Sequence, residues 1–150
     1  QALDLAFATP DAAGSAGVES HYRVSARAKT GALVRIAARL GAIAADASLE
    51  DEAALAEWAG EIGLAYQIRD DLEDAGGAGG DEALGRLSFA VIAGQGAHEG
   101  DDRLASVERR CRNAAQLALD RALAALDRLP PSDAREQLRS LSQRLAGSAV

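Results

Sequence analysis

The chain has 150 residues, of which 48% are hydrophobic and only 3% aromatic, and its formal net charge is −7. This length suits one domain with its own core, and the negative charge argues against nucleic acid or an anionic membrane surface as a partner. Alanine and leucine carry most of the hydrophobic content, which favours closely packed helices over sheets.

The expected setting follows from what the chain lacks. Cys111 is the single cysteine and has no partner for an internal disulfide, so we expect a reducing cytoplasm. No apolar run has the length of a membrane span, and no signal peptide is visible. The chain contains no methionine and begins at Gln1 within a helical pattern, so we expect a piece of a longer gene product.

Apolar periodicity predicts an all-α fold without a β-hairpin. In chain order, helices are expected over residues 1–8, 19–45, 51–74, 82–93, 102–129 and 133–145. Loops are expected over residues 9–17, 46–48, 75–80, 94–100 and 130–132, where small residues, glycines or prolines gather. Ser48 is placed to cap the helix that follows it, and the acids at residues 50–52 suit the positive end of that helix.

The long helices carry apolar positions at helical spacing. In the helix over residues 19–45, these are Tyr22, Ala26, Leu33, Ile36, Leu40 and Ile43. In the helix over residues 51–74, they are Leu55, Trp58, Ile62, Ala65, Ile68 and Leu72. In the helix over residues 102–129, they are Leu104, Val107, Cys111, Ala114, Ala118, Ala122 and Leu126. The last helix has Ala134, Leu138, Leu141 and Leu145. We expect these faces to form the core.

The helix over residues 51–74 ends in acids, where the backbone dipole favours cations. Asp70 and Asp74 share a face one turn apart, and Asp71 stands beside them. Three converging carboxylates repel one another unless a cation lies among them, and oxygen ligands suit a hard ion such as Mg²⁺. An ordinary solvated helix end is the alternative for this pattern.

Two glycines lie on the same side of this helix as the acids. Gly60 and Gly63 precede Gln67 at helical spacing. Two readings stay open for them. Either they leave open space that leads toward Gln67, or they let a neighbouring helix approach closely.

Lys29 is the only lysine among sixteen basic residues, in the string Lys29-Thr30-Gly31. A lysine offers a compact charge with three donors, which suits a phosphate oxygen. Thr30 can bond its own helix backbone, and Gly31 weakens the helix locally. A surface lysine on a solvated face is the alternative.

Other candidates are weaker when taken singly. Gln1 and Asp4 stand one turn apart, and Arg86 follows the glycine-rich loop, where a mobile cation is able to close over a diphosphate. A polar helix surface and a surface arginine are the alternatives. The two histidines and Cys111 lack partners at ligand or triad spacing, and we assign them no role.

Together these motifs resemble the C-terminal half of an (E)-isoprenyl diphosphate synthase, of the polyprenyl synthetase family. The order is Gln1-x-x-Asp4, then Tyr22 and Lys29-Thr30-Gly31, then Tyr66-Gln67-x-x-Asp70-Asp71-x-x-Asp74, then Gly85-Arg86. The string from Leu129 to Arg135 also resembles the family's last inter-helix turn. The resemblance covers all 150 residues and implies an antiparallel helical bundle of the isoprenoid synthase type, of which residues 1–150 hold only the C-terminal helices.

The resemblance implies an enzyme that condenses isopentenyl diphosphate with an allylic diphosphate. It implies that Asp70, Asp71 and Asp74 form the second aspartate-rich motif, which binds Mg²⁺ with the allylic diphosphate. Lys29 would contact that diphosphate. The remaining implied roles are oxygen dipoles near the carbocation from Thr30 and Gln67, and substrate contacts from Gln1, Asp4 and Arg86. Arg86 stands where the family usually has lysine, so its role is the one in question.

The family's first aspartate-rich motif belongs upstream of Gln1, so the resemblance implies that residues 1–150 alone lack prenyl transfer. It also implies a homodimer, or association with the missing N-terminal half. Two other functions stay open. One is a non-catalytic regulatory or interaction subunit, against which the retained aspartates and Lys29 count. The other is a class I terpene cyclase on the same fold.

Overall fold

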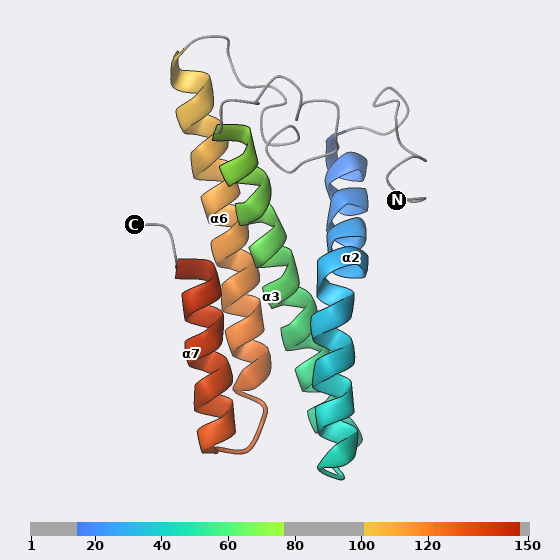
Figure 1. Cartoon of the computed structure of the whole chain (residues 1–150). Coiled ribbons are helices and arrows are strands. Elements are labelled where there is room, and N and C mark those ends of the chain that lie inside the picture. Colours follow the sequence, from blue (N-terminus) through green and yellow to red (C-terminus); the bar gives the residue numbers. More distant parts are fainter. Residues whose placement is uncertain (1–14, 77–100, 148–150) are drawn as a thin grey trace.

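The structure, a computed structural model, describes residues 15–76 and 101–147 of the chain. This part consists of four helices and contains no strand, as the sequence predicts. They are α2 (Ser15–Ala44), α3 (Leu49–Gly76), α6 (Asp101–Leu126) and α7 (Asp133–Gly147). The four helices lie roughly alongside one another and alternate in direction, which makes an antiparallel bundle (Figure 1).

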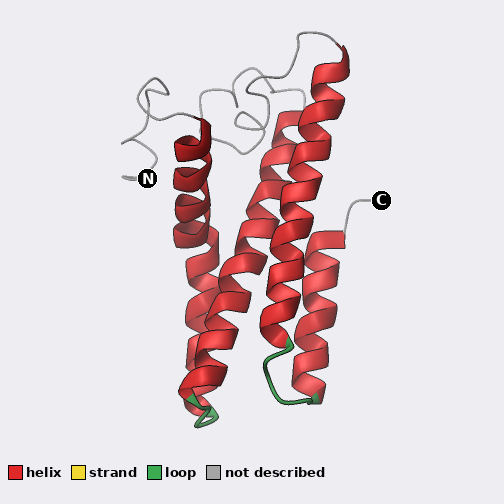
Figure 2. Cartoon of the chain, turned by 180° about the vertical axis from the view of Figure 1, so that it is seen from behind, coloured by secondary structure: helices red, strands yellow, loops and turns green. Residues whose placement is uncertain are grey.

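Helix α3 is the centre of the bundle because it packs against each of the other three helices. Seen from behind, α2 and α6 flank α3, and α7 lies beside the lower part of α6 (Figure 2) and also contacts α3. Consecutive residues from Trp58 to Ala65 are all buried. A helix that is apolar nearly all round needs neighbours on every side, and this arrangement supplies them.

The described helix boundaries follow local signals. Asp46 adopts a left-handed backbone with φ of 48°, which breaks the chain between α2 and α3. The Ser48 hydroxyl accepts a hydrogen bond from the Asp51 backbone N–H at 3.1 Å and donates one to the Asp51 carboxylate at 2.8 Å. The predicted cap is therefore confirmed. Helix α2 begins at Ser15, before the expected end of the loop at residue 17.

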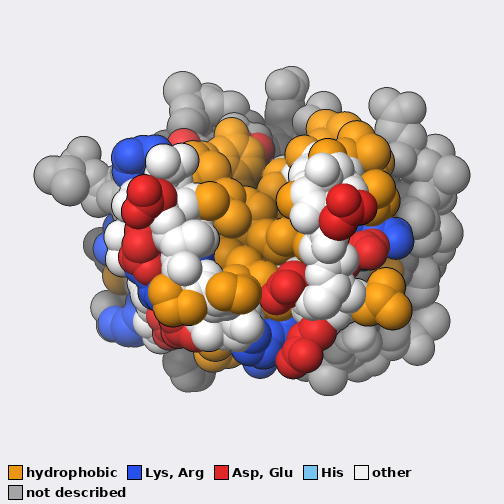
Figure 3. Space-filling model, turned by 90° about the horizontal axis from the view of Figure 1, so that it is seen from below, with side chains coloured by type: hydrophobic (Ala, Val, Ile, Leu, Met, Phe, Trp, Pro, Cys, Tyr) orange, Lys and Arg blue, Asp and Glu red, His pale blue; other side chains and the backbone are white. Residues whose placement is uncertain are grey.

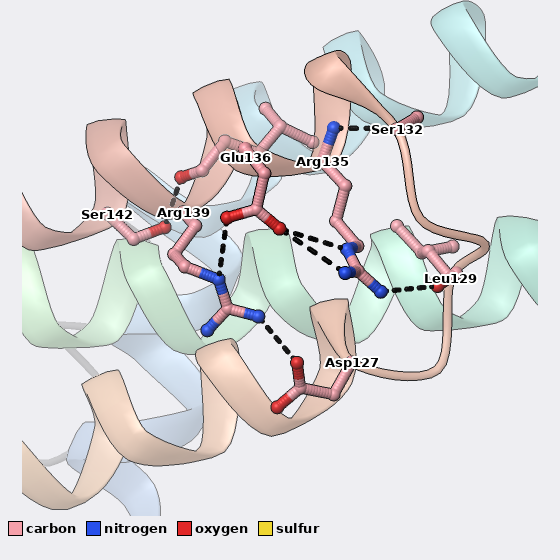
Figure 4. A network of polar contacts seen from close by, with 8 residues as sticks. Asp127, Leu129, Ser132, Arg135, Glu136, Arg139 and Ser142 are labelled. Atoms are coloured by element: carbon pink, nitrogen blue, oxygen red, sulfur yellow. Dashed lines mark hydrogen bonds and ion pairs between the residues drawn. The ribbon is translucent and has the colours of Figure 1, made fainter.

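The turn between α6 and α7 also forms as expected, and Figure 4 shows its polar contacts. Ser132 caps α7 by accepting from the Arg135 backbone N–H at 3.2 Å, while the Arg135 guanidinium donates to the Leu129 carbonyl at 3.0 Å. Arg139 of α7 pairs with both Asp127 and Glu136. The contacts of Ser132 and Arg135 satisfy an amide and a carbonyl that the helix ends leave without helical partners.

The core has two clusters along α3. The upper cluster joins α2, α3 and α6, through Tyr22, Ala26, Leu64, Ala65, Ile68, Val107, Cys111 and Ala118. The lower cluster joins α3 and α6, through Trp58, Ala59, Ile62, Leu119, Ala122, Ala125 and Leu126. Leu138 and Leu145 of α7 pack against the lower cluster. The predicted core faces of α3 and α6 are thus confirmed where their side chains are described, except at Leu55, which is half-buried and belongs to neither cluster.

The predicted stripe on α2 is only half right. Tyr22 and Ala26 are buried, but the lower four members of the stripe are 56% to 74% exposed, namely Leu33, Ile36, Leu40 and Ile43. The lower half of α2 instead turns Gly31, Val34, Ala38 and Ala42 inward. Small side chains there let α2 lie close to α3, which moves the larger apolar side chains to the outer face.

The glycines decide how close α2 and α3 come. A Cβ built on Gly63 would lie 2.6 Å from the Gly31 Cα, and one built on Gly31 would lie 3.6 Å from the Gly60 Cα. The second of the two readings, close approach of a neighbouring helix, is therefore confirmed, and no open space runs along these glycines toward Gln67.

The lower end of the bundle carries the two described loops. Seen from this end, hydrophobic side chains gather between the two loop regions (Figure 3). A shallow pocket of about 470 Å³ lies between α2 and α3 near this end, and its lining includes Arg39 and Glu52, which pair at 2.7 Å. No helix in the described part of the chain is long and apolar enough to cross a membrane. Helices expected over residues 1–8 and 82–93, and the loop over 94–100, lie outside the described residues.

Candidate functional site

The upper end of α3 brings together segments that are distant in sequence. Thr30 of α2 donates a hydrogen bond to the Gln67 side-chain oxygen at 2.7 Å. The Gln67 amide nitrogen donates to Asp71 Oδ1 at 2.9 Å, one turn further along α3. The Lys29-Thr30-Gly31 string and the aspartate-rich string therefore meet at one point, although 37 positions separate Thr30 from Gln67.

A fourth side chain completes this network. The Tyr22 hydroxyl donates to Asp71 Oδ2 at 2.6 Å, so each oxygen of the Asp71 carboxylate accepts a hydrogen bond from a different residue. Sequence reasoning placed Tyr22 on an apolar face and gave it no role. Its position seven residues before Lys29 puts it on the same side of the helix, but nothing in the sequence linked it to Asp71.

Burial shapes the chemistry around Asp71. Tyr22 is only 4% exposed, and its burial, helped by the Asp71 charge, raises the pKa of its hydroxyl far above the usual range. The hydroxyl therefore keeps its proton and acts as a donor. Cys111 of α6 is 1% exposed, and burial, followed by the charge of Asp71, raises the pKa of its thiol to about 11. The thiol is thus neutral and packs as a small apolar group.

The two aspartates of the motif whose side chains are described, Asp70 and Asp71, differ in their surroundings. Asp71 is half-buried in the network, whereas the neighbouring Asp70 is exposed. Consecutive helix positions point about 100° apart, which accounts for the difference. Asp74 belongs to the last turns of α3, but its side chain lies outside the described residues. Lys29 is exposed on α2 directly before Thr30.

The remaining predicted site residues are not placed. Gln1, Asp4 and Arg86 lie outside the described residues. Their implied substrate contacts stay predictions.

Other acids near this end have protein partners. Glu73 pairs with Arg69 at 3.2 Å, and Arg69 also donates to the Leu145 carbonyl of α7. No basic residue occupies the last turn of α3. Arg69 therefore offsets one acid of this end and holds α7 to α3, while Asp71 lies on the side toward α2.

A second polar contact crosses the same interface lower down. Arg27 of α2 pairs with Glu61 of α3, and Glu61 is 7% exposed. Within the described part of the chain, Glu61 Oε2 is a buried oxygen without a hydrogen-bond partner. Sequence reasoning missed this pair. It places a buried carboxylate against a guanidinium close to the Gly31 contact, where loss of either partner would leave the other without its pair.

The oxygen atoms at the upper end of α3 are of the kind that a hard cation requires as ligands. Both described aspartates offer carboxylate oxygens, and a carboxylate oxygen is able to accept more than one contact, so the hydrogen bonds to Asp71 leave room for an ion. Among the side chains that the structure describes, no group of three acidic, histidine or cysteine ligands comes together. Of the three aspartates expected to bind the cation, Asp70 and Asp71 have described side chains of a suitable type, and Asp74 is the third in the sequence.

In this helical bundle a line of hydrogen bonds runs from Thr30 through Gln67 to Asp71, and comparison with known proteins identifies the class to which such a bundle belongs. The Polyprenyl synthetase family model matches residues 1–124, and the chain belongs to this family. The resemblance seen in the sequence is thereby confirmed.

Relatives and solved structures agree with this membership. The chain is 34% identical over 132 residues to farnesyl diphosphate synthase of Escherichia coli, a match that covers 80% of this chain and 42% of the relative. It is 49% identical over 51 residues to geranylfarnesyl diphosphate synthase of Aeropyrum pernix, covering 34% of this chain and 16% of the relative.

The fold is shared with two solved structures. A polyprenyl synthase from Roseobacter denitrificans superposes with a TM-score of 0.79 at 26% identity, covering 99% of this chain and 58% of that one. A decaprenyl diphosphate synthase from Rhodobacter capsulatus superposes with a TM-score of 0.77 at 25% identity, covering 97% and 54%. The chain thus spans less than two thirds of the length of each of these proteins.

Proposed function

We propose that these residues form one wall of the active site of a prenyltransferase that joins isopentenyl diphosphate to an allylic diphosphate. The observation that carries this proposal is the hydrogen-bonded line from Thr30 through Gln67 to Asp71. It joins the two segments that the family resemblance assigns to the allylic diphosphate. Family membership and the names of the relatives support the same reaction class.

Each residue has a separate part in this proposal. Asp70, Asp71 and Asp74 would hold Mg²⁺, which supplies positive charge to the diphosphate leaving group. Lys29 would add a cation to the same group. Thr30 and Gln67 would present oxygens beside the carbocation, and the buried helices around them would exclude water that otherwise quenches it.

The complete active site would also need the part of the synthase fold that these 150 residues do not match. The match covers 42% of the length of the Escherichia coli relative, and no three possible cation ligands come together among the side chains that the structure describes. We therefore expect the facing carboxylates and arginines to come from the rest of a complete synthase. By itself the 150-residue chain would lack prenyl transfer.

The outer face of α2, which carries Leu33, Ile36, Leu40 and Ile43, is a candidate surface for contact with another part of the protein. Its exposed apolar residues are unusual for a surface that faces water alone. We propose that this face is covered in the assembled protein, by the remainder of the synthase fold or by a second copy in a homodimer. The cytoplasmic location expected from the sequence stays a prediction.

The test uses the complete gene product that contains these residues, beside the 150-residue chain alone. Each is incubated with Mg²⁺ and an allylic diphosphate, with and without labelled isopentenyl diphosphate, and products are separated by chain length. Elongation that requires isopentenyl diphosphate supports the proposal. Products formed without it would indicate a terpene cyclase. An inactive complete protein that activates a partner synthase would indicate a regulatory subunit.

A matched pair of variants locates the activity. Asp70→Asn in the complete protein should lower turnover by about 100-fold or more, because it removes a charge from the metal site. Asp120→Asn changes an exposed acid on α6, far along the bundle from this end, and should leave turnover unchanged. Equal turnover in both variants would contradict the proposed site.

A further inference from the structure

The two aspartates at the end of α3 are held unequally. Asp71 accepts from Tyr22 at 2.6 Å through one oxygen and from Gln67 at 2.9 Å through the other. A carboxylate with a donor on each oxygen cannot rotate without losing one of them. The orientation of the Asp71 carboxylate is therefore set by α2 and by the preceding turn of α3, whereas Asp70 is exposed.

The donor from α2 is itself rigidly placed. The Tyr22 ring belongs to the upper core cluster, where it is 4% exposed among residues of all three helices, including Ile68 of α3 and Cys111 of α6. A tyrosine has few rotatable bonds, and close packing leaves its hydroxyl only one place to point. Because the ring is held by the core, its hydrogen bond fixes the position of the Asp71 carboxylate.

The amide of Gln67 is held in the same way. Thr30 donates to its oxygen at 2.7 Å, so its nitrogen faces Asp71. The line of donors thus ends at Asp71 from both directions, and Tyr22 is the one member of the network that the family motifs left without a role.

We propose that Tyr22 is a positioning residue for the cation site, acting through Asp71, whose carboxylate it holds at a fixed angle at the end of α3. This inference rests on the proposed function, since it takes the aspartates as cation ligands. Residues that hold a metal ligand in place contribute to affinity although they do not touch the ion, and their removal typically weakens metal binding by about 10- to 100-fold.

The chain offers a matched control, because it contains two tyrosines. Tyr22→Phe removes only the hydroxyl of the buried ring. Tyr66→Phe makes the same change at a side chain of α3 that is 40% exposed. Mn²⁺ binding to the 150-residue chain and to both variants is measured by the electron paramagnetic resonance signal of the free ion, and circular dichroism checks that each variant is folded.

We expect Tyr22→Phe to bind Mn²⁺ about tenfold more weakly than the unsubstituted chain and Tyr66→Phe to bind within about twofold of it. Equal affinity of Tyr22→Phe and the unsubstituted chain would overturn the positioning role. In that case Mn²⁺ binding is also measured for Asp70→Asn. Weaker binding by Asp70→Asn would support the cation site and reject only the role of Tyr22. Absence of Mn²⁺ binding by the unsubstituted chain would overturn a cation site formed by these residues alone, and the positioning role with it.

A second measurement does not depend on the folding of Tyr22→Phe. The chain is prepared with 3-fluorotyrosine, and its two fluorine signals are assigned with Tyr66→Phe. Mg²⁺ is expected to shift the Tyr22 signal, because the Asp71 oxygens that accept its proton then share their charge with the ion, and to leave the Tyr66 signal in place. A Tyr22 signal that does not move while Mg²⁺ binds would reject the inference.

Discussion

Gly63 of α3 lies directly against Gly31 of α2, so closely that a Cβ on Gly63 would come within 2.6 Å of the Gly31 Cα. The contact is between two backbones, and neither helix has a flexible side chain there that is able to move aside. The distance between α2 and α3 is therefore set four residues before Gln67, next to the hydrogen bond from Thr30 to Gln67 that joins the two helices.

Gly63→Ala should separate α2 from α3 and destabilise the chain. Overpacking of this kind costs about 1–3 kcal/mol of unfolding free energy. Urea denaturation followed by circular dichroism measures the loss. Gly41→Ala is the control, because nothing lies within 4 Å of its added methyl group. That variant should gain about 0.5–1 kcal/mol from helix propensity. Equal stabilities of the two variants would contradict the close contact.

Ser142→Ala should lower the unfolding free energy, because it leaves the buried indole N–H of Trp58 without an acceptor. The Trp58 N–H donates to the Ser142 hydroxyl at 2.8 Å, and Ser142 is 0% exposed. Without that acceptor the buried N–H loses its partner, which costs about 1–3 kcal/mol. The fluorescence of Trp58, the only tryptophan, follows unfolding in urea directly. Ser140→Ala changes an exposed serine two residues before Ser142, on another face of α7, and should stay within about 0.5 kcal/mol of the unsubstituted chain.

The raised pKa of Cys111 predicts a loss of stability at alkaline pH. Burial raises the pKa of the thiol from 9.0 to about 11, so the folded chain holds this proton more tightly than the unfolded chain does. The resulting stabilisation is fully present below pH 9 and is lost as the pH rises through about 11. One proton limits the slope to about 1.4 kcal/mol per pH unit.

Urea midpoints across this alkaline range test the contribution of the thiol. The decline in stability should be shallower in Cys111→Ala than in the unsubstituted chain. Some decline should remain, because Tyr22 also holds its proton more tightly when the chain is folded. Identical slopes for the two proteins would show that the thiol does not titrate differently in the folded state.

The exposed stripe on α2 predicts self-association of the isolated chain. Leu33, Ile36, Leu40 and Ile43 form a continuous apolar face at intervals of three and four residues. Size-exclusion chromatography with light scattering should show dimers or larger species, and Ile36→Lys with Leu40→Lys should shift them toward monomer. Leu117→Lys changes a single exposed leucine of α6 and should leave the distribution unchanged. A monodisperse monomer before any substitution would contradict the prediction.

Local sequence signals predicted the helical parts well where the signal is itself local. The cap at Ser48, the turn at Pro130-Pro131 and the core face of α6 depend on residues within one or two turns of each other. The same reasoning failed for the lower half of α2. There the periodic apolar residues form the outer face, since contact between glycines and alanines brings α2 and α3 together and periodicity alone does not say which face has a neighbour.

For the site, sequence alone determined the family and the candidate residues, because an aspartate pair after Gln67 and the only lysine before Thr30 are readable as spacing. Only the tertiary structure decided how those residues meet. It placed Thr30 against Gln67, and it brought Tyr22 from 49 positions away to hold Asp71. Such partners depend on helix packing, which arises from contacts summed over the whole bundle and leaves no short pattern in the chain.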